Sequence, residues 1–297
     1  MNLAAQAQRW SKNFDTGSMP NVLTSMVVFP DGYVFVNKTL DGQQGGSYSY
    51  TVIDAAGDTT FTRTIQTPGT NQYGGSSQAV ILLPDFSLVM ADSRIATGGG
   101  EADGVAVKFS PDGDTVWTVS YGLTDTDILM AMDVVGDSGL AFFGSTKSGQ
   151  YYDMRLIRTD TAGNVMWSQT YGGFEDQQCY SGQQTLDGGF ILSGFRWFNN
   201  DHLNMYVVKV DSLGNQQWDG TYGSPWIDNT GFIWQLPDSG YILAGAQRLS
   251  ETGFRYPTFY RLDASGDVVW SRVYNELVSG PLYTSPHYVP GEGFAAA

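Results

Sequence analysis

The sequence predicts an all-β protein made of repeated four-stranded units, and three observations support this fold class. A turn of the general form Asp-x-x-Gly-Asp/Asn recurs along the chain, an aromatic residue follows its glycine four positions later, and the spacing between these aromatics stays near fifty residues. The aromatic residues are Phe61, Trp117, Trp167, Trp218 and Trp270, and Trp10 occupies the corresponding place before Phe61. A repeat of this length built from strands and turns is typical of a β-propeller.

The period divides the chain into about six blades, of which five are complete. Each complete unit resolves into four short strands, a to d, with alternating apolar residues and with Gly, Asp, Asn or Pro at their ends. In the clearest unit the strands are expected near 179–185, 190–196, 205–210 and 215–222. The complete units are expected at 21–67, 76–121, 127–171, 177–222 and 229–274.

The sixth unit is expected to be split between the two ends of the chain. Its strand d is predicted at 8–14, its strand a at 285–289 and its strand b at 294–297, with no strand c. Propellers complete one unit with strands from both termini because an open sheet edge is costly. Two alternatives follow, a three-stranded closing unit or a C-terminal part absent from this sequence, and the second is favoured. We therefore expect a single propeller domain over 8–297, truncated at its C-terminus.

Recurrent aspartates at the turns are interpreted as turn formers. Asp54, Asp160, Asp211 and Asp263 begin the turns between strands c and d, where a carboxylate can accept backbone N–H groups two residues on. These turns lack the alternating oxygen ligands of a calcium loop, so a Ca²⁺ role is disfavoured and no cofactor is predicted.

The row of strand d aromatics invites interpretation as sugar-stacking platforms. Its regular recurrence instead favours packing between adjacent sheets, because one ring at a fixed place in every sheet is what such packing requires. The Tyr-Gly pairs that follow are expected to end strand d and turn the chain inward: Tyr121-Gly122, Tyr171-Gly172 and Tyr222-Gly223.

Composition limits the partners and the compartment. Thirty acidic and fifteen basic residues give a net charge of −15, which disfavours nucleic acid and anionic membranes as partners. No apolar run is long enough to span a bilayer. Ala5-Gln6-Ala7 has the small-x-small pattern of a signal-peptide cleavage site, so residues 1–7 are interpreted as the remnant of a secretion signal. The single cysteine, Cys179, is expected to be a small buried residue.

The best-preserved repeat carries a family resemblance. Asp160 to Gly173 reads D-x-x-G-N-x-x-W-x-x-x-Y-G-G, and Thr185 to Gly194 reads T-x-D-G-G-F-I-x-x-G. Together they resemble the propeller-type repeats of large secreted proteins from Bacteroidota, which often carry a sorting domain for type IX secretion. The resemblance covers most of the chain, is strongest over 105–275, and implies an exported, extracellular or cell-surface propeller. It implies no particular activity.

Candidate functional residues are sought where the units differ. The a–b and c–d turns share one face of a propeller and are regular here, whereas the d–a and b–c loops on the opposite face vary. Asp127, Asp176 and Asp228 lie in the d–a loops, ten or eleven residues before the next turn aspartate. They are interpreted as caps of strand a, with a cation site or an acid–base pair at the channel mouth as the alternative.

Aromatic and arginine residues gather in the same variable loops. Such side chains form surfaces for stacking on sugar rings or peptide side chains, with loop packing as the simpler interpretation. These residues are Arg94, Arg196, Trp197, Trp226, Arg255 and Tyr256. The two histidines, His202 and His287, have no metal-ligand spacing, and no nucleophile elbow or phosphate loop is present.

The first functional expectation is therefore a non-enzymatic propeller that binds extracellular protein or glycan, as an adhesion or scaffold module. One alternative is a carbohydrate-active enzyme, a glycosidase or lyase, that uses carboxylates at the channel mouth. Another is a structural subunit of an extracellular assembly. Fold alone does not choose among these alternatives.

Overall fold

The computed structural model describes residues 21–29, 32–40, 46–67, 70–73, 79–95, 100–123, 125–136, 139–198, 202–275, 287–289 and 293–295. Within these ranges the regular structure consists of strands alone, as predicted, and no helix of the length and apolarity needed to cross a bilayer was found. The expected signal remnant at 1–7, the expected strand at 8–14 and Trp10 lie outside the described residues.

Most strands form five antiparallel sheets whose bounds follow the fifty-residue period. The first sheet contains β1 (Asn21–Phe29), β2 (Gly32–Leu40), β3 (Gly46–Asp54) and β4 (Thr59–Thr67). The second contains β5 (Thr70–Tyr73), β6 (Val80–Leu82), β7 (Leu88–Ile95), β8 (Ala102–Phe109) and β9 (Thr115–Ser120). The third contains β10 (Asp127–Val135), β11 (Gly139–Ser148), β12 (Tyr151–Thr159) and β13 (Val165–Tyr171).

The last two sheets repeat the pattern of the third. The fourth contains β14 (Asp176–Gln184), β15 (Phe190–Phe198), β16 (His202–Val210) and β17 (Gln216–Tyr222). The fifth contains β18 (Asn229–Gln235), β19 (Tyr241–Arg248), β20 (Arg255–Leu262) and β21 (Val268–Val273). A separate hairpin pairs β22 (His287–Val289) with β23 (Gly293–Ala295).

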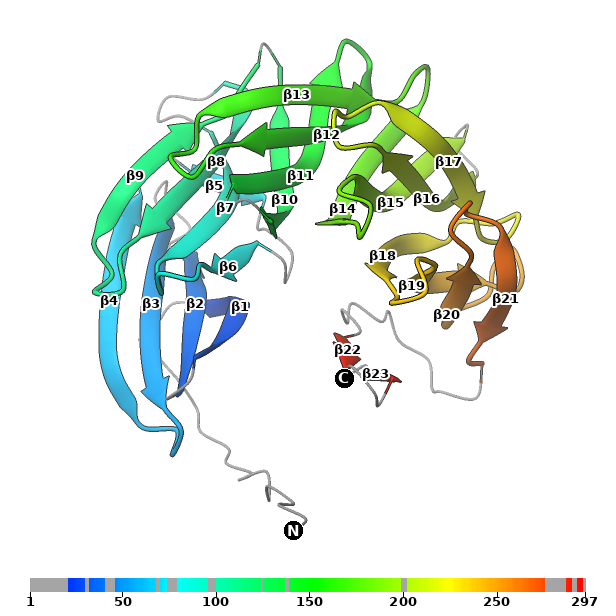
Figure 1. Cartoon of the computed structure of the whole chain (residues 1–297). Coiled ribbons are helices and arrows are strands. Elements are labelled where there is room, and N and C mark those ends of the chain that lie inside the picture. The colour runs from blue at the N-terminus through cyan, green and yellow to red at the C-terminus, as the bar shows by residue number, and fades with distance from the viewer. Residues whose placement is uncertain are drawn as a thin grey trace.

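The five sheets follow one another around an arc in the manner of a β-propeller (Figure 1). The first strand of each sheet lies toward the centre and the last strand lies at the outer rim. Within each of the four-stranded sheets the strands pair in chain order, which confirms the predicted four-stranded meander. The all-β propeller arrangement is therefore confirmed. The count of six blades is not established by the described residues.

The second sheet departs from the predicted pattern at its inner edge. Both β5 and β6 pair with β7, β5 opposite Ser93–Ile95 and β6 opposite Leu88–Met90. The inner strand of this unit thus begins at Thr70, earlier than the predicted start at 76. Sequence periodicity missed β5 because its four residues, TNQY, carry no apolar alternation.

The recurrent aspartates shape the c–d turns, as predicted. Asp160 Oδ1 accepts the backbone N–H groups of Ala162 and Asn164, at 2.9 Å each. Gly163 adopts φ +82°, a left-handed conformation that favours glycine. Asp54, Asp211 and Asp263 accept the same pair of N–H groups in their own turns. Local hydrogen bonding therefore satisfies these carboxylates.

The outer-strand aromatics connect each sheet to the next. A Cβ atom placed on Gly214 would lie 3.0 Å from Cζ3 of the Trp167 ring, and Tyr171 Oη donates to the Gly214 carbonyl at 2.9 Å. The same ring-to-glycine approach joins Phe61 to Gly113, Trp117 to Gly163 and Trp218 to Gly266. Trp270, in the last four-stranded sheet, is 46% exposed.

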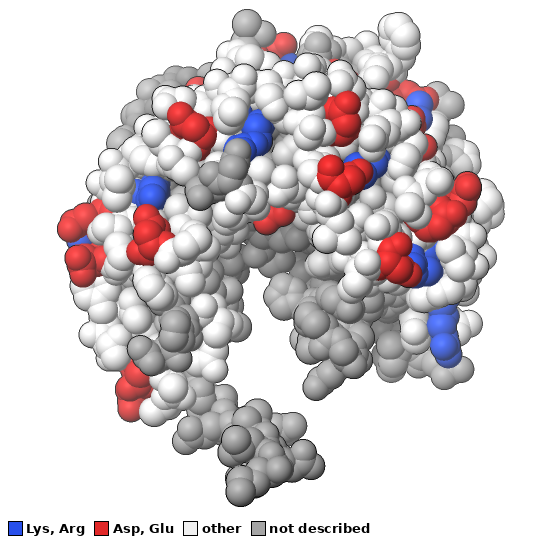
Figure 2. Space-filling model, viewed as in Figure 1, with Lys and Arg blue, Asp and Glu red and all other residues white. Residues whose placement is uncertain are grey.

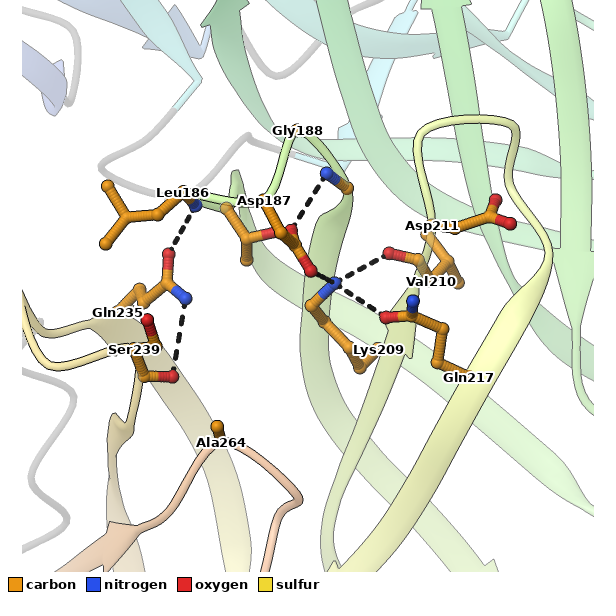
Figure 3. A network of polar contacts seen from close by, with 12 residues as sticks. Leu186, Asp187, Gly188, Lys209, Val210, Asp211, Gln217, Gln235, Ser239 and Ala264 are labelled. Atoms are coloured by element: carbon orange, nitrogen blue, oxygen red, sulfur yellow. Dashed lines mark hydrogen bonds and ion pairs between the residues drawn. The ribbon is translucent and has the colours of Figure 1, made fainter.

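A cationic side chain paired with the aspartate of the a–b turn recurs in three sheets and was not anticipated from the sequence. Lys209, only 3% exposed, donates from Nζ to Asp187 Oδ2 at 2.8 Å, to the Val210 carbonyl at 2.9 Å and to Gln217 Oε1 at 2.9 Å (Figure 3). Lys108 pairs with Asp85 at 3.2 Å and Arg261 pairs with Asp238 at 2.5 Å in the same places. Acidic and basic side chains accordingly lie side by side on the face seen in Figure 2.

The inner strands β10 and β14 each contain a β-bulge, to which a buried serine of the preceding sheet is hydrogen-bonded. The pairing of β10 with β11 shifts register between Leu129 and Ala131, and that of β14 with β15 shifts between Cys179 and Ser181. Ser93 Oγ, from the preceding sheet, accepts the Leu129 N–H at 2.8 Å, and Ser145 Oγ accepts the Cys179 N–H at 2.9 Å. Cys179 is fully buried, as expected, and burial raises the pKa of its thiol to about 12.

The tyrosine contact between sheets gives a first prediction. Substitution Tyr171→Phe deletes the hydrogen bond to Gly214 and leaves a buried carbonyl without that donor, so the free energy of unfolding should fall by about 1 to 2 kcal/mol. Urea unfolding measures the change. Tyr151→Phe is the control, because the Tyr151 hydroxyl makes no hydrogen bond to the residues that the structure describes, and an equal loss in both variants would contradict the prediction.

The lysine network gives a second prediction. Burial alone would raise the pKa of Asp187, but the hydrogen bonds from Lys209, Thr185 and Gly189 outweigh it and lower the pKa to about 2. Because the folded pKa lies below the ordinary 3.8, this stabilisation is present above pH 3.8 and is lost as the pH falls toward 2. Substitution Lys209→Met should lower stability by about 1 to 2 kcal/mol at pH 7 and flatten this acid dependence. Unfolding titrations from neutral to acidic pH test both effects, and an unchanged acid slope would refute the assignment.

Candidate functional site

The loop face carries the d–a and b–c connections, and two of the three predicted aspartates cap inner strands there. Asp127 is 1% exposed; its Oδ2 accepts the Leu123 N–H at 2.6 Å and its Oδ1 pairs with Arg155 Nη1 at 2.6 Å. The same guanidinium nitrogen donates to the Tyr121 carbonyl at 2.6 Å. A buried pair with both carboxylate oxygens bonded is a structural anchor.

Asp228 is bound in the same way in the fifth sheet. Its Oδ2 accepts the Ser224 N–H at 2.5 Å, and its Oδ1 accepts the Ser224 hydroxyl at 2.6 Å and the Arg248 N–H at 2.9 Å. Burial raises the pKa of Asp228, against the lowering effect of these hydrogen bonds. At 1% exposure this carboxylate has no surface to offer a substrate.

Asp176 does not occupy the place of the other two aspartates. Strand pairing places Asp127 opposite Thr146 and, one period later, Gln177 opposite Arg196. Gln177 therefore takes the capping position in the fourth sheet. It is 2% exposed, and its Oε1 is buried without a hydrogen-bond partner in the described part of the chain.

Around Gln177, neighbouring carboxylates accept the backbone N–H groups. The Gly173 N–H, four residues before Gln177, donates to Asp153 Oδ1 at 3.1 Å, and the Tyr152 N–H donates to Asp176 Oδ1 at 2.8 Å. Asp153 lies at the start of β12 and Asp176 at the start of β14, so two partly exposed carboxylates from adjacent sheets face one d–a loop. Burial raises the pKa of Asp153, partly offset by the Gly173 hydrogen bond.

A third carboxylate, a guanidinium and aromatic rings complete the cluster. Glu175 Oε2 pairs with Arg196 Nε at 2.6 Å, and both side chains are about a third exposed. The Arg196 guanidinium also lies 4.6 Å from the ring centre of Phe198. Trp197 packs edge-on against Phe195 at 6.4 Å between ring centres, and Phe174, in the d–a loop, is 93% exposed. We call Asp153, Glu175, Asp176 and Arg196 the loop-face cluster.

The remaining predicted residues of the variable loops are distributed over other sheets. Arg94 lies in β7, 3.5 Å from Asp92. Trp226 is half-buried, and its N–H donates to Ser224 Oγ at 3.2 Å. Arg255 Nε donates to the Ile227 carbonyl at 3.1 Å, and Tyr256 is half-buried in β20. Trp226, Arg255 and Tyr256 therefore belong to the surroundings of Asp228 and not to the loop-face cluster.

The cluster could perform proton transfer. It combines a carboxyl group whose protonated form is favoured by burial with a second carboxylate that keeps one oxygen unoccupied by a described hydrogen bond. Separated environments for two carboxyl groups allow one to act as acid and the other as base. No group of three or more metal-ligating side chains was found among the described residues.

Sequence inspection missed Asp153 and Glu175 as site residues. Asp153 follows two tyrosines at the start of a strand and looks like an ordinary strand end, and Glu175 is next to an aspartate already chosen. A signal was nevertheless present. Aligning the units by their inner strands would have placed Gln177, not Asp176, in register with Asp127 and Asp228.

Comparisons with known proteins support the propeller fold. No family model and no curated protein matches this chain. Similar solved structures include a neuraminidase-like protein of A/little yellow-shouldered bat/Guatemala, with TM-score 0.54 and 10% identity over 93% of this chain and 89% of that one. The polysaccharide lyase Uly1 is similar with TM-score 0.50 and 10% identity, over 99% and 85% of the two chains. An apocarotenoid oxygenase of Synechocystis has TM-score 0.52 at 10% identity, over 90% and 62%.

These comparisons correct the functional expectation. A non-enzymatic binding or scaffold module was expected first, whereas the similar structures include a polysaccharide lyase, an oxygenase and a neuraminidase-like protein. The expectations that the chain is a binding module and not an enzyme are contradicted by these similar structures. At 10% identity the likeness establishes the fold alone, so the activity is argued below from the residues.

The raised pKa of Asp153 predicts how its substitution changes stability with pH. A folded pKa above the unfolded value means that stability falls as the pH rises from the ordinary 3.8 through the folded pKa. Substitution Asp153→Asn removes this cost, and Asn204 occupies the corresponding position in the next sheet, so the fold accepts the amide. The stability of the variant relative to wild type should therefore increase with pH over that range. Unfolding titrations measure the difference, and a constant difference would refute the raised pKa.

Proposed function

We propose that this chain is a carbohydrate-active enzyme, a glycosidase or lyase, that acts at the loop-face cluster between the third and fourth sheets. The observation that carries the proposal is the pair Asp153 and Asp176, two partly exposed carboxylates from adjacent sheets at the position where the strand cap is replaced by Gln177. Glycosidases act with two carboxyl groups flanking the scissile bond.

The two carboxyl groups have different roles in this proposal. Asp153, whose raised pKa favours the protonated form, is the general acid that donates a proton to the departing glycosidic oxygen. Asp176 is the base or nucleophile, because its Oδ2, which accepts no hydrogen bond from the described residues, can accept a proton from water or attack the anomeric carbon. In a lyase reaction Asp176 would instead remove the proton beside the sugar carboxylate.

Side chains around this pair supply substrate contacts. Arg196, the guanidinium of the cluster, pairs with Glu175, and a guanidinium suits a sugar carboxylate through paired N–H groups. Phe174 presents an exposed ring next to Glu175, where a sugar ring can stack. An acidic polysaccharide would use both contacts.

The expectations of a sixth blade and of export are part of this proposal. We infer a sixth sheet that includes the hairpin β22–β23, which lies beyond the fifth sheet along the chain. Action on glycan also agrees with export to the cell exterior, which the small-x-small pattern at Ala5-Gln6-Ala7 supports.

Turnover of a substrate panel tests the function. The panel combines aryl glycosides with neutral and uronate-containing polysaccharides, followed by reducing-end release and by near-ultraviolet absorbance of unsaturated uronate, which separates hydrolysis from elimination. Substitution Asp153→Asn should lower kcat by about 10²-fold or more, because proton transfer is lost while the backbone N–H of Gly173 keeps an acceptor. Activity that requires protonated Asp153 should also decline as the pH rises through its folded pKa.

A matched control comes from the neighbouring sheet. Asp103 lies against Gly122 as Asp153 lies against Gly172, so Asp103→Asn makes the same chemical change one sheet away. This variant should retain wild-type kcat. Absence of turnover across the panel, or equal losses in the two variants, would overturn the assignment of the site.

A further inference from the structure

A pocket of about 480 Å³ lies on the turn face, at the boundary between the second and third sheets. Its wall includes Pro84 and Asp85 from the turn between β6 and β7, Trp117 from β9, Val134 from β10 and Thr161 from the turn after β12. This is the face opposite the loop-face cluster, because it carries the a–b and c–d turns.

The pocket occurs where a repeated hydrogen bond between sheets is missing. At the boundary of the fourth and fifth sheets, the Leu186 N–H donates to Gln235 Oε1 at 2.7 Å (Figure 3). At the boundary of the third and fourth sheets, the Gly136 N–H donates to Gln184 Oε1 at 3.0 Å.

Both partners of this bond are replaced at the pocket. Pro84 stands in the place of Leu186 and has no N–H group, and Val134 stands in the place of Gln235 and has no amide. The side chain that fills the other boundaries is therefore shorter and apolar here, which leaves the space open.

The indole of this boundary lacks the hydrogen bond that the Trp218 indole makes at the closed boundary. Trp218 Nε1 donates to the Ala264 carbonyl of the next turn at 3.2 Å. Trp117 Nε1 is buried and makes no hydrogen bond to any residue that the structure describes. Two differences from the repeat, Pro84 and Val134, thus meet at one place beside this indole.

We propose that this pocket binds one pyranose ring of a glycan, as a site separate from the loop-face cluster. A pyranose has an apolar face of C–H groups and an edge of hydroxyls. Val134 and Pro84 supply apolar wall, the Trp117 ring supplies a stacking surface, and the ion pair of Lys108 with Asp85, 3.2 Å apart, supplies a donor and an acceptor for hydroxyls. The pair has no net charge, which favours a neutral sugar.

Indole N–H resonances of ¹⁵N-labelled protein test the site directly. The chain is titrated with methyl glycosides of glucose, galactose, mannose and N-acetylglucosamine, and the Trp117 signal is assigned with Trp117→Phe, a change for which Phe61 in the first sheet is the precedent. At least one glycoside should shift the Trp117 resonance saturably, while the Trp218 resonance at the closed boundary stays in place.

A variant designed to fill the pocket gives the decisive test. The double substitution Pro84→Leu with Val134→Gln copies the partners Leu186 and Gln235, so it should fold, and an unchanged Trp218 resonance verifies this. It should weaken binding at least about tenfold. Unaltered affinity in this variant, or no shift of Trp117 with any glycoside, would overturn the proposal. The readout needs no turnover, so it succeeds or fails independently of the activity proposed for Asp153.

Discussion

The structure depends on one contact repeated between sheets, in which the outer strand of one sheet holds the turn of the next. A tryptophan ring packs against the turn glycine, and a tyrosine hydroxyl donates to the carbonyl of the same glycine, as Trp167 and Tyr171 do at Gly214. The ring approaches the turn so closely that the residue beneath it can carry no side chain. The left-handed φ of +84° at Gly214 independently favours glycine there. Two unrelated demands thus converge on one residue per unit.

Because this contact has the same form at successive boundaries, the positions that depart from the repeat are the candidates for functional sites. Gln177 replaces a capping aspartate on the loop face, and the N–H group that a carboxylate would accept goes to Asp153 instead. On the turn face, Pro84 and Val134 remove a hydrogen bond that the following boundaries keep. Each replacement leaves the sheet contact intact and changes only the end of the sheet, where a ligand can reach it.

The aspartates illustrate how burial and hydrogen bonding separate structure from chemistry. Asp176 begins β14 and Asp228 directly precedes β18, yet Asp228 has its oxygens bonded to Ser224 and Arg248 at 1% exposure. Asp176 is partly exposed and accepts one backbone N–H from the described residues. A carboxylate whose oxygens are all engaged stabilises the fold and has no capacity left for a substrate. The same residue type therefore stabilises the scaffold in one sheet and remains partly exposed in the neighbouring sheet.

The period of the strand d aromatics and the Asp-x-x-Gly turns determined the all-β class, the four-stranded units and most strand bounds, because those signals are local and act within a few residues. The pairing of Lys209 with Asp187, the register that exchanges Asp176 for Gln177, and the joining of Asp153 to the d–a loop were decided only by tertiary structure. Each of these joins residues from different strands, and a one-residue shift in a loop is invisible to spacing along the chain. Sequence alone thus established the scaffold and the variable face, whereas packing between sheets decided which carboxylates remain accessible there.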